Sequence, residues 1–144
     1  MKSKLLADSH PEKTWALIFD AGDEAMAVLK SFAEVHSIRS AHFTAIGAFS
    51  RATLGYFDME KKEYLRIPVD EQVEVVTLIG DIALEDGKPK LHAHAALGQR
   101  SGAVIGGHLL EGHVRPTLEV ILSESPKHLE RHFDPQSGLA LIRL

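Results

Sequence analysis

Most of the chain consists of short apolar runs separated by turn residues, and one longer stretch has a helical period. Residues 14–20 (TWALIFD) are apolar and aromatic and run into Ala21-Gly22-Asp23, which indicates a strand followed by a turn. From Asp23 to Ser37, apolar residues recur at the 3.6-residue spacing of an amphipathic helix. We therefore expect a helix over residues 23–37, with Asp23 as its N-cap.

The pattern after this helix is typical of strands. Apolar runs that end at turn residues predict strands at residues 41–46, 53–58, 73–84, 89–97, 103–110 and 117–122, with residues 64–69 as a further short strand. The tail closes with the apolar run at residues 139–142. The turn signal at residues 85–88 (EDGK) predicts that the runs on its two sides pair as a hairpin. One helix beside seven or eight strands with short connections predicts a single α+β domain over residues 1–144, with an antiparallel or mixed sheet.

Composition narrows the classes of function. The chain has 144 residues, of which 44% are hydrophobic and 25% charged, as in an ordinary globular domain. Its net charge of -4 provides no overall positive field for nucleic acid. The sequence contains no cysteine, which excludes disulfide scaffolds and thiolate metal sites. It also lacks a signal-peptide core and the ~18 apolar residues of a membrane helix, so we expect a cytoplasmic protein without a membrane partner.

Histidine is the remaining soft ligand, and the chain has nine. His92 and His94 flank one residue of a predicted strand, so both side chains lie on the same face. His108 lies in the next predicted strand, after Gly106-Gly107, a pair that permits close backbone approach or a bulge. If the two strands pair, three neutral imidazoles surround one ion and leave a coordination position open. Zinc is the first expectation, although imidazole also suits nickel, copper and iron.

The competing interpretation is a polar or pH-sensitive strand face, with His108 as a hydrogen-bonded core residue. His113 follows the strand-breaking Gly112 and is a weaker candidate for a ligand or a supporting group. The remaining histidines lack useful spacing and are expected at the surface: His10, His36, His42, His128 and His132.

Charged residues near these strands supply further candidates. Glu119 lies in an otherwise apolar strand, where a carboxylate can orient a ligating imidazole or act as general base to a metal-bound water. A solvent-facing position on an edge strand explains Glu119 equally well. Arg51 and Arg115 are candidates for holding an anionic ligand, although single arginines near turns are usually solvated.

Several motifs together resemble the plant and prokaryote conserved (PPC) domain family. They are residues 74–80 (EVVTLIG), 91–95 (LHAHA), 106–112 (GGHLLEG) and 117–120 (TLEV), preceded by an early strand pair at residues 45–58. The resemblance covers nearly the whole chain. It implies an α+β fold similar to acetolactate decarboxylase, assembly as a homotrimer and, as in bacterial members, a metal held by three histidines. Those histidines would be His92, His94 and His108.

Two functions follow from the resemblance. Bacterial members are commonly described as DNA-binding proteins because plant relatives join this domain to an AT-hook, an Arg-Gly-Arg-Pro minor-groove binder. This sequence contains no such segment, and its acidic balance disfavours DNA as a partner. The first expectation is therefore a trimeric regulatory or interaction module with a bound metal. The alternative is a small zinc-dependent enzyme, a lyase or hydrolase on a small oxo-acid or acyl ligand, with Glu119 as base.

Overall fold

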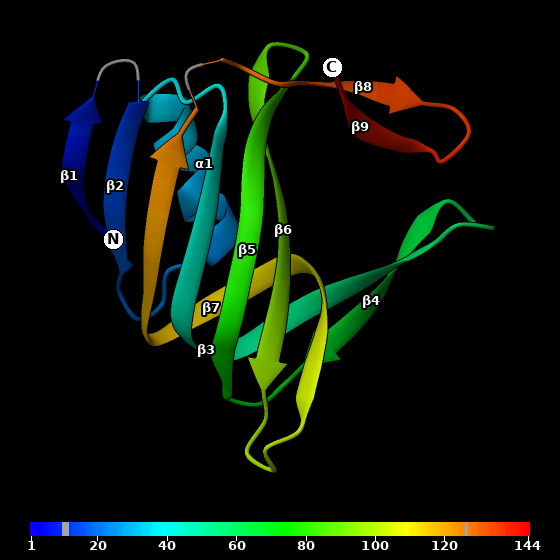
Figure 1. Ribbon diagram of the computed structural model, residues 1–144. Helices are drawn as coiled ribbons and strands as arrows, with labels where there is room; N and C mark the ends of the chain where they lie inside the picture. The colour runs from blue at the N-terminus through cyan, green and yellow to red at the C-terminus, as the bar shows by residue number, and fades with distance from the viewer. Residues whose placement is uncertain (10–11, 126) are drawn as a thin grey trace.

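The computed structural model describes residues 1–9, 12–125 and 127–144 (Figure 1). His10, one of the histidines expected at the surface, therefore lies outside the described residues. The described residues form one helix and nine strands: β1 (Lys2–Ser9), β2 (Glu12–Phe19), α1 (Ala25–Val35), β3 (Ala41–Asp58), β4 (Glu63–Val69), β5 (Val73–Glu85), β6 (Lys88–Gly98), β7 (Val104–Glu124), β8 (Glu130–Asp134) and β9 (Leu139–Arg143).

All nine strands join in one sheet, which confirms the predicted α+β class. The main path runs β1-β2-β7-β3-β5-β8-β9, while β4 pairs with β3, and β6 pairs with both β5 and β7. The β5–β8 pair is parallel and the other named pairs are antiparallel, so the sheet is mixed. Figure 1 shows β8 and β9 as a small hairpin that projects from one end of the molecule.

Helix α1 lies against one face of the sheet (Figure 1). Its apolar side, including Leu29 and Phe32, is buried with Leu17 and Phe19 of β2 in one hydrophobic core. The N-cap is Glu24, whose carboxylate accepts the N–H groups at the start of the helix, so the expected cap at Asp23 is wrong. Asp23 instead accepts the backbone N–H of Asp20 within the preceding turn. Helix α1 lacks the length and the apolar content needed to cross a membrane.

Strands β3 and β7 each replace two predicted strands. Glycine suggested an interruption in both cases, yet β3 continues through Gly47 and β7 continues through Gly112. Gly47 has φ +152 and lies so close to β7 that an added Cβ would meet Leu118 Cα at 2.8 Å and Thr117 O closer still. Glycine here permits a bulged crossing of two backbones, and the strand does not end.

Strands β1 and β8 were not predicted. Both are short, carry charged residues and present no buried apolar run, so their sequences lack the alternation that marks a half-buried strand.

The sheet face opposite α1 carries exposed apolar side chains. Ile18, Ile46, Ile79 and Ile121 are between 39% and 60% exposed and come from four strands that are neighbours in the sheet. Register places Ile79 of β5 opposite His94 of β6, so this apolar surface continues toward the histidines. We call these four residues the isoleucine face.

Candidate metal centre

Strand register brings three histidines together. His92 and His94 lie one residue apart in β6, and the pairing of β6 with β7 places His108 directly opposite His94. The connecting turn is closed by backbone hydrogen bonds between Gln99 and Ala103 and between Gly102 and Gln99. The pairing that the sequence required for a three-histidine site is therefore present.

The three side chains can offer their ligand atoms to one point. One ring nitrogen from each of His92, His94 and His108 lies within 4.8 Å of the other two. The Nε2 atoms of His92 and His94 are 3.2 Å apart, and the His92 ring stacks on the His108 ring with centroids 5.2 Å apart. We call these three residues the histidine cluster.

Glycine allows the strands around the cluster to approach closely. An added Cβ at Gly107 would lie 2.8 Å from the carbonyl oxygen of Gly55 in β3. An added Cβ at Gly55 would in turn lie 2.8 Å from the Tyr64 ring of β4. This is the close approach expected of the glycine pair before His108, and it lets the Tyr64 ring pack on His108 with centroids 4.8 Å apart.

The surroundings of His92 and His108 favour the neutral form of their imidazoles. Burial lowers the pKa of His108 to about 4, with smaller contributions from His92 and His94. Burial also lowers the pKa of His92, and the positive charge of Arg131 adds to the effect. Neutral imidazole is the form that binds a metal ion.

An unsatisfied nitrogen supports the same use of the cluster. His108 Nδ1 is buried and has no hydrogen-bond partner among the described residues. Buried polar atoms normally have a partner, and one without a protein partner calls for an explanation such as an ion. Three imidazoles whose ligand atoms converge, together with an unsatisfied ring nitrogen on His108, fit a transition metal such as zinc.

The carboxylate of Asp81 contacts the histidine cluster through His92. Asp81 of β5 pairs in register with His92, and its Oδ2 atom lies 3.8 Å from His92 Nδ1. Its other oxygen accepts a hydrogen bond from Arg131 Nη2 at 2.5 Å. Because His92 Nδ1 faces Asp81 and Nε2 faces His94, Nε2 is the atom of His92 that could hold an ion at the cluster.

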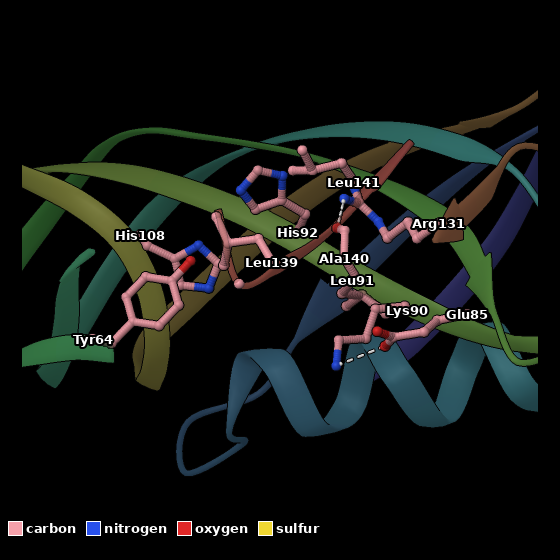
Figure 2. Close-up of a pocket in the computed structure, with 11 residues that line it drawn as sticks. Tyr64, Glu85, Lys90, Leu91, His92, His108, Arg131, Leu139, Ala140 and Leu141 are labelled. Atoms are coloured by element: carbon pink, nitrogen blue, oxygen red, sulfur yellow. Dashed lines mark hydrogen bonds and ion pairs between the residues drawn. The ribbon is translucent and has the colours of Figure 1, made fainter. Parts of the chain in front are cut away.

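A cavity of about 300 Å³ opens beside His92 and His108. Tyr64, Lys90 and Arg131 line it, and Leu139, Ala140 and Leu141 of β9 form its opposite wall. In Figure 2, the Tyr64 ring lies over His108, while the guanidinium of Arg131 lies near Leu141 and Ala140. The C-terminal hairpin thus encloses space next to the histidine cluster.

The structure places the other candidates elsewhere. Glu119 is exposed on the half of β7 that pairs with Ile18 and Ile46, and strands β3 and β5 lie between it and β6. Arg51 and His113 are cross-strand partners, with Arg51 Nη2 3.5 Å from His113 Nε2. Arg115 is exposed two residues further along β7.

Among the other described histidines, His42, His128 and His132 are exposed as expected. His36 is also exposed, although its ring lies 4.2 Å from Phe32 and 4.7 Å from Trp15 between centroids.

Sequence reasoning missed three residues of the site: Tyr64, Asp81 and Arg131. Asp81 had a usable signal, because a two-residue turn at Asp86-Gly87 pairs Glu85 with Lys88 and, counting back, Asp81 with His92. Tyr64 and Arg131 depend on how β4 and β8 meet the rest of the sheet, which no local pattern specifies.

Comparison with known proteins shows what the chain is similar to. A family model described as the Plants and Prokaryotes Conserved (PCC) domain matches residues 7–126. A PPC protein from Pyrococcus horikoshii is 38% identical, with a TM-score of 0.85 and coverage of 91% of each chain. A metal-containing protein from Archaeoglobus fulgidus is also 38% identical, with a TM-score of 0.85 and coverage of 92% of this chain and 94% of that chain.

A third similar structure is a "putative DNA-binding protein" from Ralstonia eutropha JMP134, 30% identical, with a TM-score of 0.85 and coverage of 90% of each chain. Acetolactate decarboxylase from Bacillus subtilis strain 168 shares the fold at 16% identity and a TM-score of 0.57, with coverage of 88% of this chain and 58% of that chain. No curated protein matches the chain.

Proposed function

The chain belongs to the Plants and Prokaryotes Conserved (PCC, also written PPC) domain family, and from this premise we propose that it is a homotrimeric protein that binds one divalent metal ion per chain. His92, His94 and His108 are the ligands, and zinc is the first candidate. The observation that carries the proposal is the convergence of their ligand atoms within 4.8 Å of one another. The relative from Archaeoglobus fulgidus, described as metal-containing, supports it.

The residues of the site have distinct tasks in this proposal. The three imidazoles supply neutral nitrogen donors and leave a coordination position open. Asp81 holds the His92 ring in the orientation that directs Nε2 to the metal. A bound ion would supply Lewis acidity or lower the pKa of a bound water.

Elemental analysis of untagged protein purified without chelators tests the metal. We expect about one ion per chain in the wild type and none in a His92→Ala, His94→Ala, His108→Ala variant, because removing the nitrogen donors removes the site.

The matched control for this experiment is a His42→Ala, His128→Ala, His132→Ala variant. It removes the same number of histidines from exposed positions outside the cluster, so we expect it to keep the ion. Wild-type protein without metal, or equal metal content in both variants, would overturn the proposal.

The homotrimer is supported by the isoleucine face. An apolar patch on one face of a sheet favours a buried contact, and closed symmetric assemblies are the usual outcome for identical chains. The mass of the wild type and of both histidine variants, measured by light scattering, tests assembly separately from metal content. A trimer that survives metal loss indicates a functional ion, and one that dissociates indicates a structural ion.

The biological role we propose is regulatory, as the description of the Ralstonia eutropha relative suggests. A chain with net charge -4 needs a local basic surface to hold phosphates. A DNA mobility shift at low salt, where electrostatic binding is strongest, tests this part alone. No shift there would overturn DNA binding and leave the metal proposal intact.

The second candidate is a small metal-dependent enzyme, a lyase or hydrolase acting on an oxo-acid or acyl substrate. The cavity of about 300 Å³ beside His92 and His108 favours it, because a substrate could lie next to the cluster. Burial raises the pKa of Tyr64, so its hydroxyl stays protonated and can donate a hydrogen bond into the cavity. Glu119 lies outside this cavity's lining, and a base role for it would need a second copy of the chain.

A substrate screen with NMR detection of products distinguishes the two candidates. Turnover of an oxo-acid or acyl compound by the wild type, lost in the His92, His94, His108 triple variant, would establish the enzyme. Turnover that survives in the triple variant would contradict a role for the cluster.

A further inference from the structure

Arg131 is a buried arginine with unused hydrogen-bonding capacity. Its side chain is 8% exposed, yet it lines the cavity beside the histidine cluster. Nη2 donates to Asp81, Nη1 makes a long 3.3 Å bond to Ala140 O, and Nε has no hydrogen-bond partner among the described residues. A guanidinium offers five N–H donors, and burying them unpaired is costly. A ligand with oxygen acceptors would therefore improve the environment of Arg131.

The charge around the cavity favours an anion. Arg131 is paired with Asp81, and Lys90 Nζ lies 3.0 Å from Glu85 Oε2, so these charged residues compensate one another. Imidazoles that bind a metal ion do so in the neutral form and add no charge of their own. A divalent ion on the histidine cluster would leave about two positive charges uncompensated next to the cavity. An anionic ligand offsets that charge in a partly buried site.

The walls of the cavity limit the rest of the ligand. Leu91 of β6 and Leu139 and Leu141 of β9 are apolar, and the enclosed volume is about 300 Å³. Figure 2 shows the β9 residues facing the strand that carries His92. A space of this size holds a small molecule, and its apolar side favours a short hydrocarbon body.

We propose that the cavity binds a small monocarboxylate with a short apolar body, whose carboxylate lies between Arg131 and the histidine cluster. The planar guanidinium suits a planar carboxylate because two parallel N–H donors can meet two oxygens. The hydrocarbon body packs against Leu139 and Leu141. This inference deepens the proposed function and rests on it, since the ion supplies part of the positive charge.

The β8–β9 hairpin supplies the selective part of this site. The family model ends at residue 126, while Arg131 and the β9 wall come from the segment that follows. The histidine cluster lies within the matched residues, and the groups that choose the ligand lie beyond them. Ligand preference can therefore differ between proteins that share the same three histidines.

Isothermal titration calorimetry with two probes of nearly the same shape tests the proposal. Metal content is first measured by elemental analysis, and the metal-loaded protein is then titrated with isovalerate and with isovaleramide. We expect isovalerate to bind at least about tenfold more tightly, because only the carboxylate makes charge-assisted hydrogen bonds to Arg131. Arg131→Met should remove this preference. Arg143→Met, an exposed arginine on the same hairpin, is the matched control and should retain it.

A second variant tests the cavity without changing its charge. Leu139→Trp fills the space beside the cluster and should weaken isovalerate at least about tenfold while metal content stays unchanged. Three outcomes would overturn the carboxylate site and leave the metal proposal standing. They are equal binding of the two probes, no binding of isovalerate to the metal-loaded wild type, and unchanged isovalerate binding in Leu139→Trp. Absence of metal from the wild type overturns both proposals, and elemental analysis detects that failure before any titration.

Discussion

Asp81 shows how a single side chain can serve both parts of the site. One carboxylate oxygen faces His92 Nδ1 and the other accepts the hydrogen bond from Arg131. The carboxylate therefore connects the histidine cluster to the C-terminal hairpin. A carboxylate that contacts one ring nitrogen of a ligating histidine fixes the tautomer and the orientation of the ring. The other nitrogen, which faces the metal, then becomes a stronger ligand.

Replacing Asp81 with asparagine should weaken zinc binding by about ten- to hundredfold, because the amide orients His92 less strongly. Competition with a chromophoric chelator measures the affinity. The ¹⁵N chemical shifts of His92 should also show loss of the single tautomer, which a purely structural role would leave unchanged. Asp70→Asn, at an exposed position away from the cluster, is the control. Equal affinity in the two variants would contradict this role for Asp81.

Gly80 has no side chain and therefore allows the His92 carbonyl oxygen and the Phe43 ring to lie close to its backbone. An added Cβ would lie 2.5 Å from the carbonyl oxygen of His92 and closer still to the Phe43 ring, which is buried in the core. Gly80→Ala should therefore lower the free energy of unfolding by about 1–3 kcal/mol, as expected for overpacking. Chemical denaturation measures the change.

Gly98→Ala is the matched control for Gly80→Ala. It lies in the neighbouring strand, and its added Cβ would meet the end of the Val76 side chain at 3.2 Å, so a small side-chain movement relieves the contact. If Gly98→Ala lowered the free energy of unfolding as much as Gly80→Ala, close packing at Gly80 would not be the cause of the destabilisation.

At the scale of elements, the β8–β9 hairpin is joined to the sheet by few polar contacts. Leu84 N donates to Leu129 O at 2.8 Å, Lys62 Nζ donates to Pro135 O at 2.7 Å, and Arg131 pairs with Asp81. Elements with few buried contacts open at lower free energy than the core. We therefore expect the hairpin that lines the proposed ligand cavity to open at lower free energy than the core.

The turn of this hairpin should respond to acid. The Asp134 carboxylate accepts hydrogen bonds from Ser137, and these lower its pKa below the usual value of 3.8. Since the folded-state pKa is the lower one, this contribution to stability is complete above about pH 4 and is lost as the pH falls through the folded pKa. We expect the protection of the Gly138 amide, whose N–H donates to Asp134 O, to fall in that window when its exchange rate is compared with the intrinsic rate at the same pH.

Asp134→Asn provides the comparison for this pH dependence. It removes the titrating group, so the difference in Gly138 protection factor between variant and wild type should be largest near neutral pH and should shrink in acid. A difference that does not depend on pH would contradict the assignment to Asp134.

At the scale of the whole molecule, the isoleucine face is the surface that we propose to mediate assembly. Its four side chains lie on the sheet surface that α1 does not cover, and Ile79 is opposite His94. A trimer that buries this face would also change the surroundings of the histidine cluster. Assembly and metal binding are therefore expected to influence each other.

Placing a charge on the isoleucine face should prevent the trimer. We expect an Ile46→Asp, Ile121→Asp variant to run as a folded monomer of 15.8 kDa in light scattering. The native Glu119 already lies opposite Ile46, so the two added carboxylates would place three like charges on the surface that the trimer buries. Val35→Asp is the control, since Val35 is 76% exposed at the end of α1, away from this face. A variant that keeps the wild-type mass would locate the contact elsewhere.

Local patterns in the sequence were sufficient to predict several parts of this protein. The period of two in β6 places His92 and His94 on one face, and the period of 3.6 predicts α1. The turn at Asp86-Gly87 defines a register that includes the Asp81–His92 pair. These features follow from the sequence because each depends on neighbours within one hairpin or one helix.

Only the tertiary structure decided which distant residues meet. Glu119 and His108 lie on the same strand, and β3 pairs with both halves of β7. The other edge of β7 pairs with β2 near Glu119 and with β6 near His108, so Glu119 lies between Ile18 and Ile46 while His108 joins the cluster. Arg131 reaches Asp81 because the β8–β9 hairpin docks beside β5. Contacts between segments far apart in sequence depend on bulges, backbone crossings and packing, which leave no periodic signal in the chain.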